Sequence, residues 1–272
     1  MEIAIASIQR NRNPYIVEWL AFHLCVGFNK FYIYAHQCDD GMKETLAKLA
    51  PYYPIVWQEI DCDFAQKHAY AHAIDNYLIP QSDWMAFIDG DEFLFPVQHN
   101  NMAEALANYT DKPLSALGVY WMCYGSSGHL TEPSGLLLEN FTRHAEVDCI
   151  PNRYVKSIVR GGGRHVNRIS EVHVFETTMG TFDEQMRPIV DSDDASREPS
   201  HKVFRINHYL TQSYDSFRYI KSQWATPDSN VVGSRGQDWF DRHDRNEFDD
   251  GVRYRFLIAL KLKINEMSRY LE

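Results

Sequence analysis

Residues 83–94 read DWMAFIDGDEFL, an apolar run that stops at two acids around a glycine and then becomes apolar again. The run Trp84–Ile88 is too short for an independent helix and shows no alternation of polar and apolar residues. It therefore predicts a strand that is buried on both faces at the centre of a sheet. Asp89 and Asp91 point the same way in an extended segment, and Gly90 between them leaves the backbone open to close approach.

Two neighbouring carboxylates repel each other unless a cation lies between them. Oxygen ligands suit Mg²⁺ or Mn²⁺, ions that keep room for waters and substrate phosphates, so the acid pair predicts a metal–diphosphate site. The alternative is a plain turn, because Asp-Gly is among the commonest turn dipeptides. Position favours the metal site, since ligands of open α/β sheets bind beyond the carboxyl ends of the strands.

Composition describes a globular protein. The 272 residues are 44% hydrophobic and 14% aromatic, enough for one large domain or a domain with an appended lobe. The formal net charge of -10 argues against a nucleic-acid partner and against a polybasic membrane patch. No run approaches the roughly eighteen apolar residues of a transmembrane helix, so none is predicted.

The cysteines are odd in number and widely spaced, without a C-x-x-C pair: Cys25, Cys38, Cys62, Cys123 and Cys149. This pattern predicts reduced thiols and a cytoplasmic location rather than a disulfide framework. The N-terminal residues also lack the basic and apolar regions of a signal peptide. Peripheral association with the inner face of a membrane stays open.

Strands alternate with helices up to about residue 100. Strands are expected at Ile3–Ile8, Phe31–Ala35 and Ile55–Ile60, and helices at Tyr15–Phe28, Met42–Ala50 and Phe64–Leu78, with Asn13 as the cap of the first helix. The alternation predicts right-handed crossovers and a mostly parallel sheet. Neither a glycine fingerprint after the first strand nor a P-loop motif is present, which disfavours dinucleotide and P-loop folds.

The pattern is looser after residue 100. Expected are helices at Met102–Tyr109, Tyr214–Trp224 and Phe256–Leu271, and strands at Leu114–Met122, Tyr154–Val159, Val172–Phe175 and Lys202–Leu210. His208 falls near the end of the last of these strands.

Several segments resemble one known family. Residues 10–23 read RNRNPYIVEWLAFH and resemble the opening of glycosyltransferases in the family 2-like and family 92-like group, and residues 84–93 resemble their metal motif. Residues 31–41, 125–129 and 206–213 match further segments in the expected order. Two positions depart from the pattern, because Arg12 stands where Glu is common and Gln212 replaces the usual Lys.

The resemblance implies an α/β fold of the GT-A type: a Rossmann-like, mostly parallel central sheet flanked by helices, with a smaller mixed region on the acceptor side. It implies a nucleotide-sugar-binding half at residues 1–100, an acceptor-side half at 101–225 and a helical extension at 226–272. The implied function is inverting transfer of a hexose from a UDP-sugar to a hydroxyl of a glycan or glycolipid, with Mn²⁺ or Mg²⁺ on the donor diphosphate.

The positions at strand ends and the resemblance together suggest a set of site residues. Metal ligands are expected at Asp89, Asp91 and His208, and donor contacts at Arg10, Asn11, Asn13, Asp39, Gln66, Asp89, Gly90 and Asp91. The reaction needs a base for the acceptor hydroxyl as well as charge stabilisation, in which Asp91 takes part through the metal. The candidate bases are Asp148, Glu171, His173 and His129, and Glu171 is favoured.

Two other classes of function compete with this one. A metal-dependent phosphohydrolase or nucleotidyltransferase could use the same acid pair, although no convincing ligand set for a second metal is apparent. A catalytically silent sugar-binding domain would not need the combination of Asp89, Asp91 and His208.

Overall fold

The computed structural model describes residues 1–192, 194–223 and 235–271. Within them lies a ten-stranded sheet whose main order is β12-β11-β6-β8-β4-β1-β2-β3. Its first half is parallel and consists of β1 (Ile3–Gln9), β2 (Lys30–His36), β3 (Ile55–Ile60) and β4 (Trp84–Phe87). The parallel half expected from the alternation of strands and helices is therefore confirmed.

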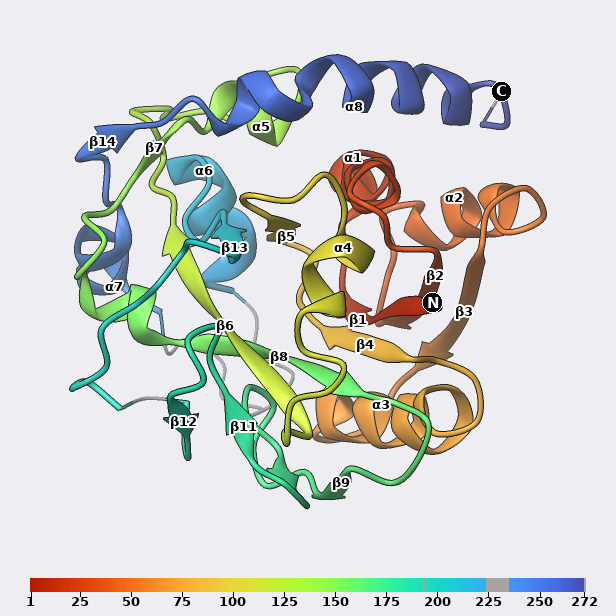
Figure 1. The fold of residues 1–272 in the computed structure, drawn as a ribbon. Helices are drawn as coiled ribbons and strands as arrows, with labels where there is room; N and C mark the ends of the chain where they lie inside the picture. Colours follow the sequence, from red (N-terminus) through yellow and green to blue (C-terminus); the bar gives the residue numbers. More distant parts are fainter. Residues whose placement is uncertain (193, 224–234, 272) are drawn as a thin grey trace.

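Helices cover both faces of this half. They are α1 (Asn13–Cys25) and α2 (Met42–Leu49) on one face and α3 (Ala65–Ala73), continued by the π-helix η1 (Ile74–Leu78), on the other, as Figure 1 shows. The side chains of β4 alternate between the two layers. Trp84, Ala86 and Ile88 belong to the core under α1, and Met85 and Phe87 to the core under α3. The segment before the acids is thus a central strand buried on both faces, as predicted.

The other half of the sheet is mixed. β8 (Val155–Arg160) runs antiparallel to both β4 and β6 (Ala116–Cys123), and β6 is followed by β11 (Thr181–Phe182) and β12 (Pro188–Ile189). β13 (Phe204–His208) lies between β5 (Glu92–Pro96), to which it is antiparallel, and β6, to which it is parallel. The resulting α/β architecture, with a parallel half and a smaller mixed region, confirms the expected fold class.

The remaining elements surround the sheet. They are α4 (Met102–Ala107), α5 (Leu137–Asn140), β7 (Arg143–His144), the 3-10 helix η2 (Ile150–Arg153), β9 (Val166–Arg168), β10 (Glu176–Thr177), α6 (Tyr214–Ser216), the π-helix η3 (Phe217–Lys221), α7 (Gln237–His243), β14 (Phe248–Asp249) and α8 (Val252–Ser268). α8 lies across α1, where the rings of Phe256 and Phe22 are 5.2 Å apart (Figure 1). The proposed boundary between residues 225 and 226 lies outside the described residues.

Three expectations about local structure change. Arg12, not Asn13, caps α1, and the helix ends at Cys25 rather than Phe28. The Asn13 side chain instead donates to the carbonyl of Asp40. Residues 172–175 form no strand: Val172 and Phe175 are buried by packing on the α3 side of the sheet, without strand pairing. Trp224, the expected end of the helix that begins at Tyr214, is not among the described residues.

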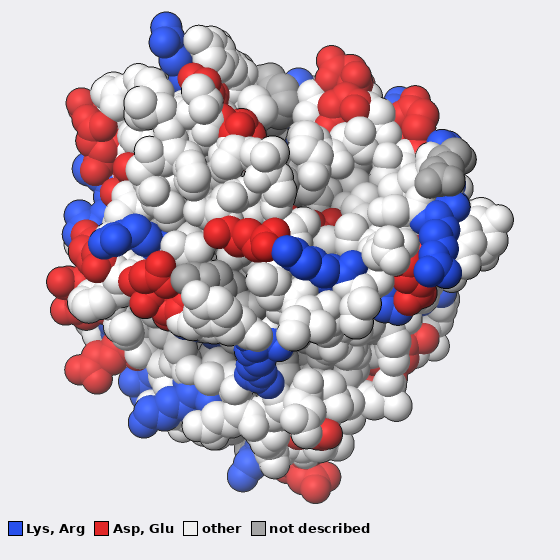
Figure 2. Space-filling view, turned by 90° about the horizontal axis from the view of Figure 1, so that it is seen from above, with Lys and Arg blue, Asp and Glu red and all other residues white. Residues whose placement is uncertain are grey.

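The outer surface carries both signs of charge. Figure 2 looks down on the α8 side of the molecule and shows acidic and basic side chains interspersed there. Lys261 of α8, for example, forms an ion pair with Glu139 of α5. Among the residues described, no helix is both long and apolar enough to span a bilayer.

Candidate functional site

A cavity of about 530 Å³ lies beyond the carboxyl ends of β1 and β4. It is lined by Ile8, Gln9, Arg10, Arg12, Gln66, Asp89, Gly90, Asp91, Trp121, Pro151, Tyr154, Val172, His173, His208, Leu210, Ile220, Lys221, Arg235, Trp239 and His243. Six of the donor and metal contacts predicted from the sequence are therefore brought together here, namely Arg10, Gln66, Asp89, Gly90, Asp91 and His208. The sheet explains this convergence, because parallel strands end at a common edge.

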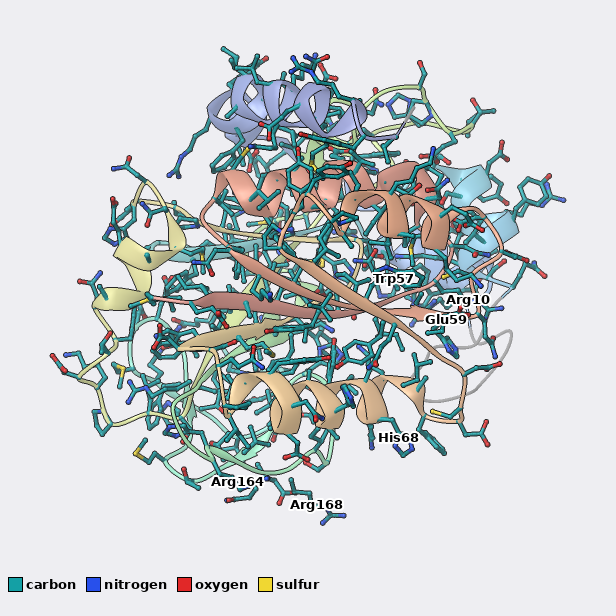
Figure 3. All side chains as sticks on the ribbon, turned by 90° about the vertical axis from the view of Figure 1, so that its right-hand side faces the viewer. Arg10, Trp57, Glu59, His68, Arg164 and Arg168 are labelled. Atoms are coloured by element: carbon teal, nitrogen blue, oxygen red, sulfur yellow. The ribbon has the colours of Figure 1, made fainter. Side chains whose placement is uncertain are left out.

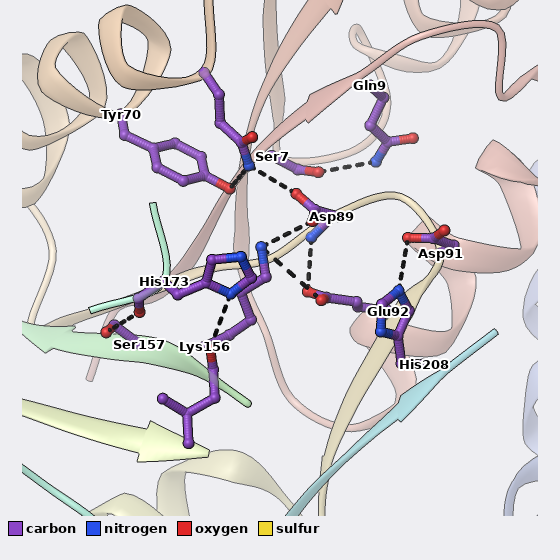
Figure 4. Close-up of polar contacts among 12 residues, drawn as sticks. Ser7, Gln9, Tyr70, Asp89, Asp91, Glu92, Lys156, Ser157, His173 and His208 are labelled. Atoms are coloured by element: carbon purple, nitrogen blue, oxygen red, sulfur yellow. Dashed lines mark hydrogen bonds and ion pairs between the residues drawn. The ribbon is translucent and has the colours of Figure 1, made fainter. Parts of the chain in front are cut away.

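Asp89 is held by side chains from two other elements. One carboxylate oxygen accepts a hydrogen bond from Gln66 Nε2 of α3 at 2.9 Å, and the other is paired with Lys156 Nζ of β8 at 2.8 Å (Figure 4). The Lys156 side chain is 1% exposed, so its charge is neutralised inside the protein rather than by water. Asp89 is thereby fixed in orientation at the wall of the cavity.

Asp91 faces a different pair of groups. Its Oδ2 lies 2.7 Å from Lys221 Nζ. Its Oδ1 lies 3.6 Å from His208 Nε2, as Figure 4 shows. Burial raises the pKa of Asp91, but Lys221 and His208 outweigh this effect and hold it well below its usual range. Burial also lowers the pKa of His208, although Asp91 opposes the shift. Asp91 is therefore a carboxylate beside a neutral imidazole.

Buried groups behind the acids support the loop. Glu92 is fully buried and accepts a hydrogen bond from the Asp89 N–H at 2.9 Å. Burial raises the pKa of Glu92 well above its usual value. The indole N–H of Trp19 donates to the carbonyls of Asp89 and Glu92 at 3.2 and 2.9 Å. α1 thus fixes the backbone around the acid pair.

The two positions that depart from the family pattern contact each other. Arg12 Nη1 lies 3.4 Å from Gln212 Oε1, and with the amide turned over, its oxygen accepts from both guanidinium nitrogens of Arg12 at 2.9 and 3.1 Å. Arg12 also donates to the carbonyl of Gly90 at 3.2 Å. The residues at the two departing positions are therefore hydrogen-bonded to each other in this chain.

Three predicted donor contacts lie outside the cavity lining. The side chains of Asn11 and Asp39 bond to each other at 2.6 Å and join the loops after β1 and β2. Asn13 links α1 to the loop before α2. The structure thus engages these three residues in local structure, and their contact with a donor stays a prediction. Arg10 does line the cavity, and Figure 3 shows it at the same end of the sheet as Glu59 of β3.

Of the four candidate bases, one lines the cavity and three do not. His173 lines the cavity, and its Nδ1 lies 3.1 Å from the carbonyl of Val155, which it can reach only as an N–H donor (Figure 4). Glu171, Asp148 and His129 are not among the lining residues. The Glu171 carboxylate instead accepts a hydrogen bond from the Ser192 hydroxyl. The assignment of Glu171 as base stays a prediction.

Several lining residues were not anticipated. Lys221 and Arg235 add positive charge, and aromatic rings form two walls: Trp121 stacks on Tyr154 with centroids 5.4 Å apart, and Trp239 stacks on His243 at 4.2 Å. Lys156, which does not line the cavity, was also missed, although the sequence held a signal for it: a lysine near the start of an otherwise buried strand needs a buried counter-charge.

The donor atoms fit a divalent cation in part. Asp91 Oδ1 and His208 Nε2 are 3.6 Å apart, close enough for both to bind one ion at bond lengths of about 2.1 Å. Both oxygens of Asp89 already accept hydrogen bonds. Within the described ranges, no group of three or more His, Cys, Asp or Glu side chains is arranged around a common point. Carboxylate and imidazole supply two ligands, and Mg²⁺ or Mn²⁺ commonly takes the rest from water and phosphate.

Comparison with known proteins gives matches over most of the chain. The family model described as Glycosyltransferase family 92 matches residues 2–232. A family 92 protein of Oryza sativa subsp. japonica is 26% identical over 249 residues, which are 86% of this chain and 38% of the relative. One of Arabidopsis thaliana is 26% identical over 231 residues, 80% of this chain and 36% of the relative. The chain thus spans little more than a third of the length of these relatives.

Solved structures give more distant likenesses. S. aureus TarS 1-349 in complex with UDP has a TM-score of 0.38 and 15% identity, covering 59% of this chain and 47% of that chain. HddC from Yersinia pseudotuberculosis has a TM-score of 0.31 and 11% identity, covering 59% of this chain and 68% of that chain.

Proposed function

The chain belongs to glycosyltransferase family 92, and from this premise we propose that it transfers a hexose from a UDP-sugar to a hydroxyl of a glycan or glycolipid, with inversion at the anomeric carbon. The observation that carries the proposal is the cavity beyond β1 and β4, which combines an acid pair with four basic side chains. These are Arg10, Arg12, Lys221 and Arg235. The excess of positive charge suits an anionic diphosphate.

Donor binding uses the residues at the strand ends. The basic side chains neutralise the diphosphate, and Gln66 and Lys156 keep Asp89 in position beside it. We propose Asp91 and His208 as ligands of Mn²⁺ or Mg²⁺, supported by the 3.6 Å between Oδ1 and Nε2. The ion, when bound, supplies charge stabilisation for the departing diphosphate. Direct coordination by Asp89 requires one of its two present hydrogen bonds to break.

Acceptor activation requires a base inside the cavity. We propose His173, because the Val155 carbonyl that accepts from Nδ1–H fixes the tautomer in which Nε2 is the basic nitrogen. Nε2 takes the proton of the acceptor hydroxyl while the oxygen of that hydroxyl forms a bond to the anomeric carbon. The bond from that carbon to the diphosphate oxygen breaks, and UDP leaves with the electron pair. Trp121, Tyr154 and Trp239 offer aromatic faces for a carbohydrate acceptor.

The first test is calorimetric titration of UDP into the protein, with Mn²⁺ and then with EDTA, and of GDP as the comparison nucleotide. UDP binding that is much tighter with Mn²⁺ than in EDTA and that exceeds GDP binding supports the donor assignment. Absence of binding by either nucleotide would contradict it. Incubation with UDP-hexoses and mixed oligosaccharides then measures transfer, and phosphate or UMP release without an acceptor would indicate a phosphohydrolase instead.

The base is tested with matched variants. His173→Asn should lower kcat at least about a hundredfold with little change in the affinity for UDP. Glu171→Gln is the matched comparison, since Glu171 lies two residues away and does not line the cavity. The opposite ranking of the two variants would return the assignment to Glu171.

A further inference from the structure

Each acid of the pair already has a lysine ammonium as its partner. Lys156 Nζ lies 2.8 Å from Asp89, and Lys221 Nζ lies 2.7 Å from Asp91. An ammonium and a divalent cation compete for the same carboxylate oxygens. These lysines therefore affect how tightly a metal ion binds in the site. The two lysines differ in burial and in their neighbours, so we expect them to respond differently to a bound ligand.

Lys156 is a fixed component of the protein. It is the second residue of β8, its side chain is 1% exposed, and it also lies 3.9 Å from Glu92 (Figure 4). It is not among the residues that line the cavity. Moving this ammonium away would leave Asp89 and Glu92 close together without a counter-charge. Lys156 therefore stays with its carboxylates whether or not a ligand is bound.

Lys221 is placed for exchange. It is the last residue of η3, its side chain is 16% exposed, and it lines the cavity. Its ammonium is shared between Asp91 and the backbone carbonyl of Leu210. The long, flexible side chain can therefore turn from Asp91 toward a ligand in the cavity while it keeps contact with solvent.

We propose that Lys221 is the internal counter-ion of Asp91 in the nucleotide-free protein and exchanges with the donor-bound metal. In this exchange the divalent cation takes the Asp91 carboxylate, and the ammonium moves to the diphosphate. The inference rests on the proposed donor and metal site. A cation bound to Asp91 and His208 lies close to the present position of Lys221 Nζ, so the two positive charges repel until a diphosphate draws the ammonium away.

The exchange makes the two ligands cooperative. Without a nucleotide, the metal ion must displace the Lys221 ammonium, which then has no anionic partner in the cavity. The metal ion therefore binds weakly. With UDP present, Lys221 has an anionic partner and Asp91 is released to the metal. Because such coupling is reciprocal, Mn²⁺ must increase the affinity for UDP by the same factor that UDP increases the affinity for Mn²⁺.

Substitution of Lys221 tests the exchange without an activity assay. Free Mn²⁺ is measured by electron paramagnetic resonance during titration of the wild type, Lys221→Met and Lys221→Gln, first without nucleotide and then with UDP. Both variants should bind Mn²⁺ alone about tenfold more tightly than the wild type, and UDP in EDTA about tenfold more weakly. Lys221→Arg keeps the charge and should resemble the wild type in metal affinity.

Lys261→Met is the matched control. It also breaks a lysine–carboxylate pair, with Glu139, but on the surface of α8, and should change neither affinity. Thermal melting of every variant shows that it is folded. Because two neutral variants are used, the test still works if one of them does not fold. Lys221→Arg shows whether a positive charge at this position is sufficient to keep the metal affinity of the wild type.

The outcomes separate this inference from the proposed function. If the wild type binds Mn²⁺ in the presence of UDP but the neutral variants bind Mn²⁺ alone no more tightly than the wild type, the exchange is overturned and the metal site stands. If the wild type binds UDP without any uptake of Mn²⁺, both the metal site and the exchange are overturned. Tighter metal binding by the neutral variants, with weaker UDP binding in EDTA, supports the exchange.

Discussion

Acidification should lower the free energy of unfolding through His23, a buried histidine that joins α1 to β5. His23 Nδ1 lies 2.8 Å from the carbonyl of Trp19, and its Nε2 accepts a hydrogen bond from the Leu94 N–H at 3.1 Å. The ring is fully buried, and burial lowers the pKa of His23 from 6.5 to about 3. Protonation of Nε2 would remove the acceptor for Leu94 and place a charge in the core.

The magnitude follows from linkage. Because the folded pKa is below the unfolded one, the stability contributed by neutral His23 is complete above pH 6.5 and is lost as the pH falls toward 3. A tenfold change in proton affinity corresponds to about 1.4 kcal/mol, so the full loss is about 5 kcal/mol and the loss at pH 4 is about 3 kcal/mol.

The assay is urea unfolding of the wild type and His23→Gln between pH 7.5 and pH 4. The glutamine can donate to Trp19 and accept from Leu94 but does not titrate, so the variant should lose about 3 kcal/mol less than the wild type over this range. His68→Gln is the control, because His68 points from α3 into solvent (Figure 3). Parallel stability curves for the wild type and His23→Gln would refute the reasoning.

Three further predictions concern the frame of the site. Lys156→Met leaves Asp89 and the buried Glu92 without the ammonium that lies beside both, and should lower the free energy of unfolding by about 3 kcal/mol. A loss below about 1 kcal/mol in urea unfolding would count against it. Burial raises the pKa of Glu18 from 4.5 to about 7, so the free energy of unfolding of the wild type should fall as the pH rises from 4.5 to 7. Glu18→Gln should remove about 3 kcal/mol of that fall, and an unchanged pH profile would contradict this. Gly161→Ala places Cβ 1.8 Å from a carbonyl oxygen and should destabilise by about 3 kcal/mol or more, whereas Gly163→Ala enters open space and should melt like the wild type; equal melting temperatures for the two variants would refute the clash.

The parts of the site that could be predicted are those with a local pattern. Asp89 and Asp91 follow an apolar strand, and His208 ends another, so their positions at strand ends were sufficient to bring them to one edge of the sheet. Gln66 was predicted as a polar residue near the start of a helix, and it reaches Asp89 across the gap between the two elements.

The residues that escaped prediction depend on tertiary pairing. Lys221 meets Asp91 only because η3 packs beside the end of β13, and no spacing in the sequence relates the two residues. The expected strand at Val172–Phe175 failed for a similar reason: its apolar side chains fill the core under α3, but no neighbouring strand is available for pairing there. Asn13 was mistaken for a helix cap because its partners, Asp40 and Thr45, belong to the following βα unit.

In the proposed donor site, the position of β13 also determines when the imidazole ligand becomes available during synthesis. This strand inserts between β5 and β6, and His208 pairs in register with Glu92 and with Cys123. A nascent chain that ends before residue 204 can form the parallel strands and expose both acids, but it lacks the imidazole that faces Asp91. Because pairing across so long a separation is slow, the ribosome-bound intermediate should mature late, and capture on immobilised UDP should select chains whose synthesis has passed both β13 and the basic residues Lys221 and Arg235 that follow it.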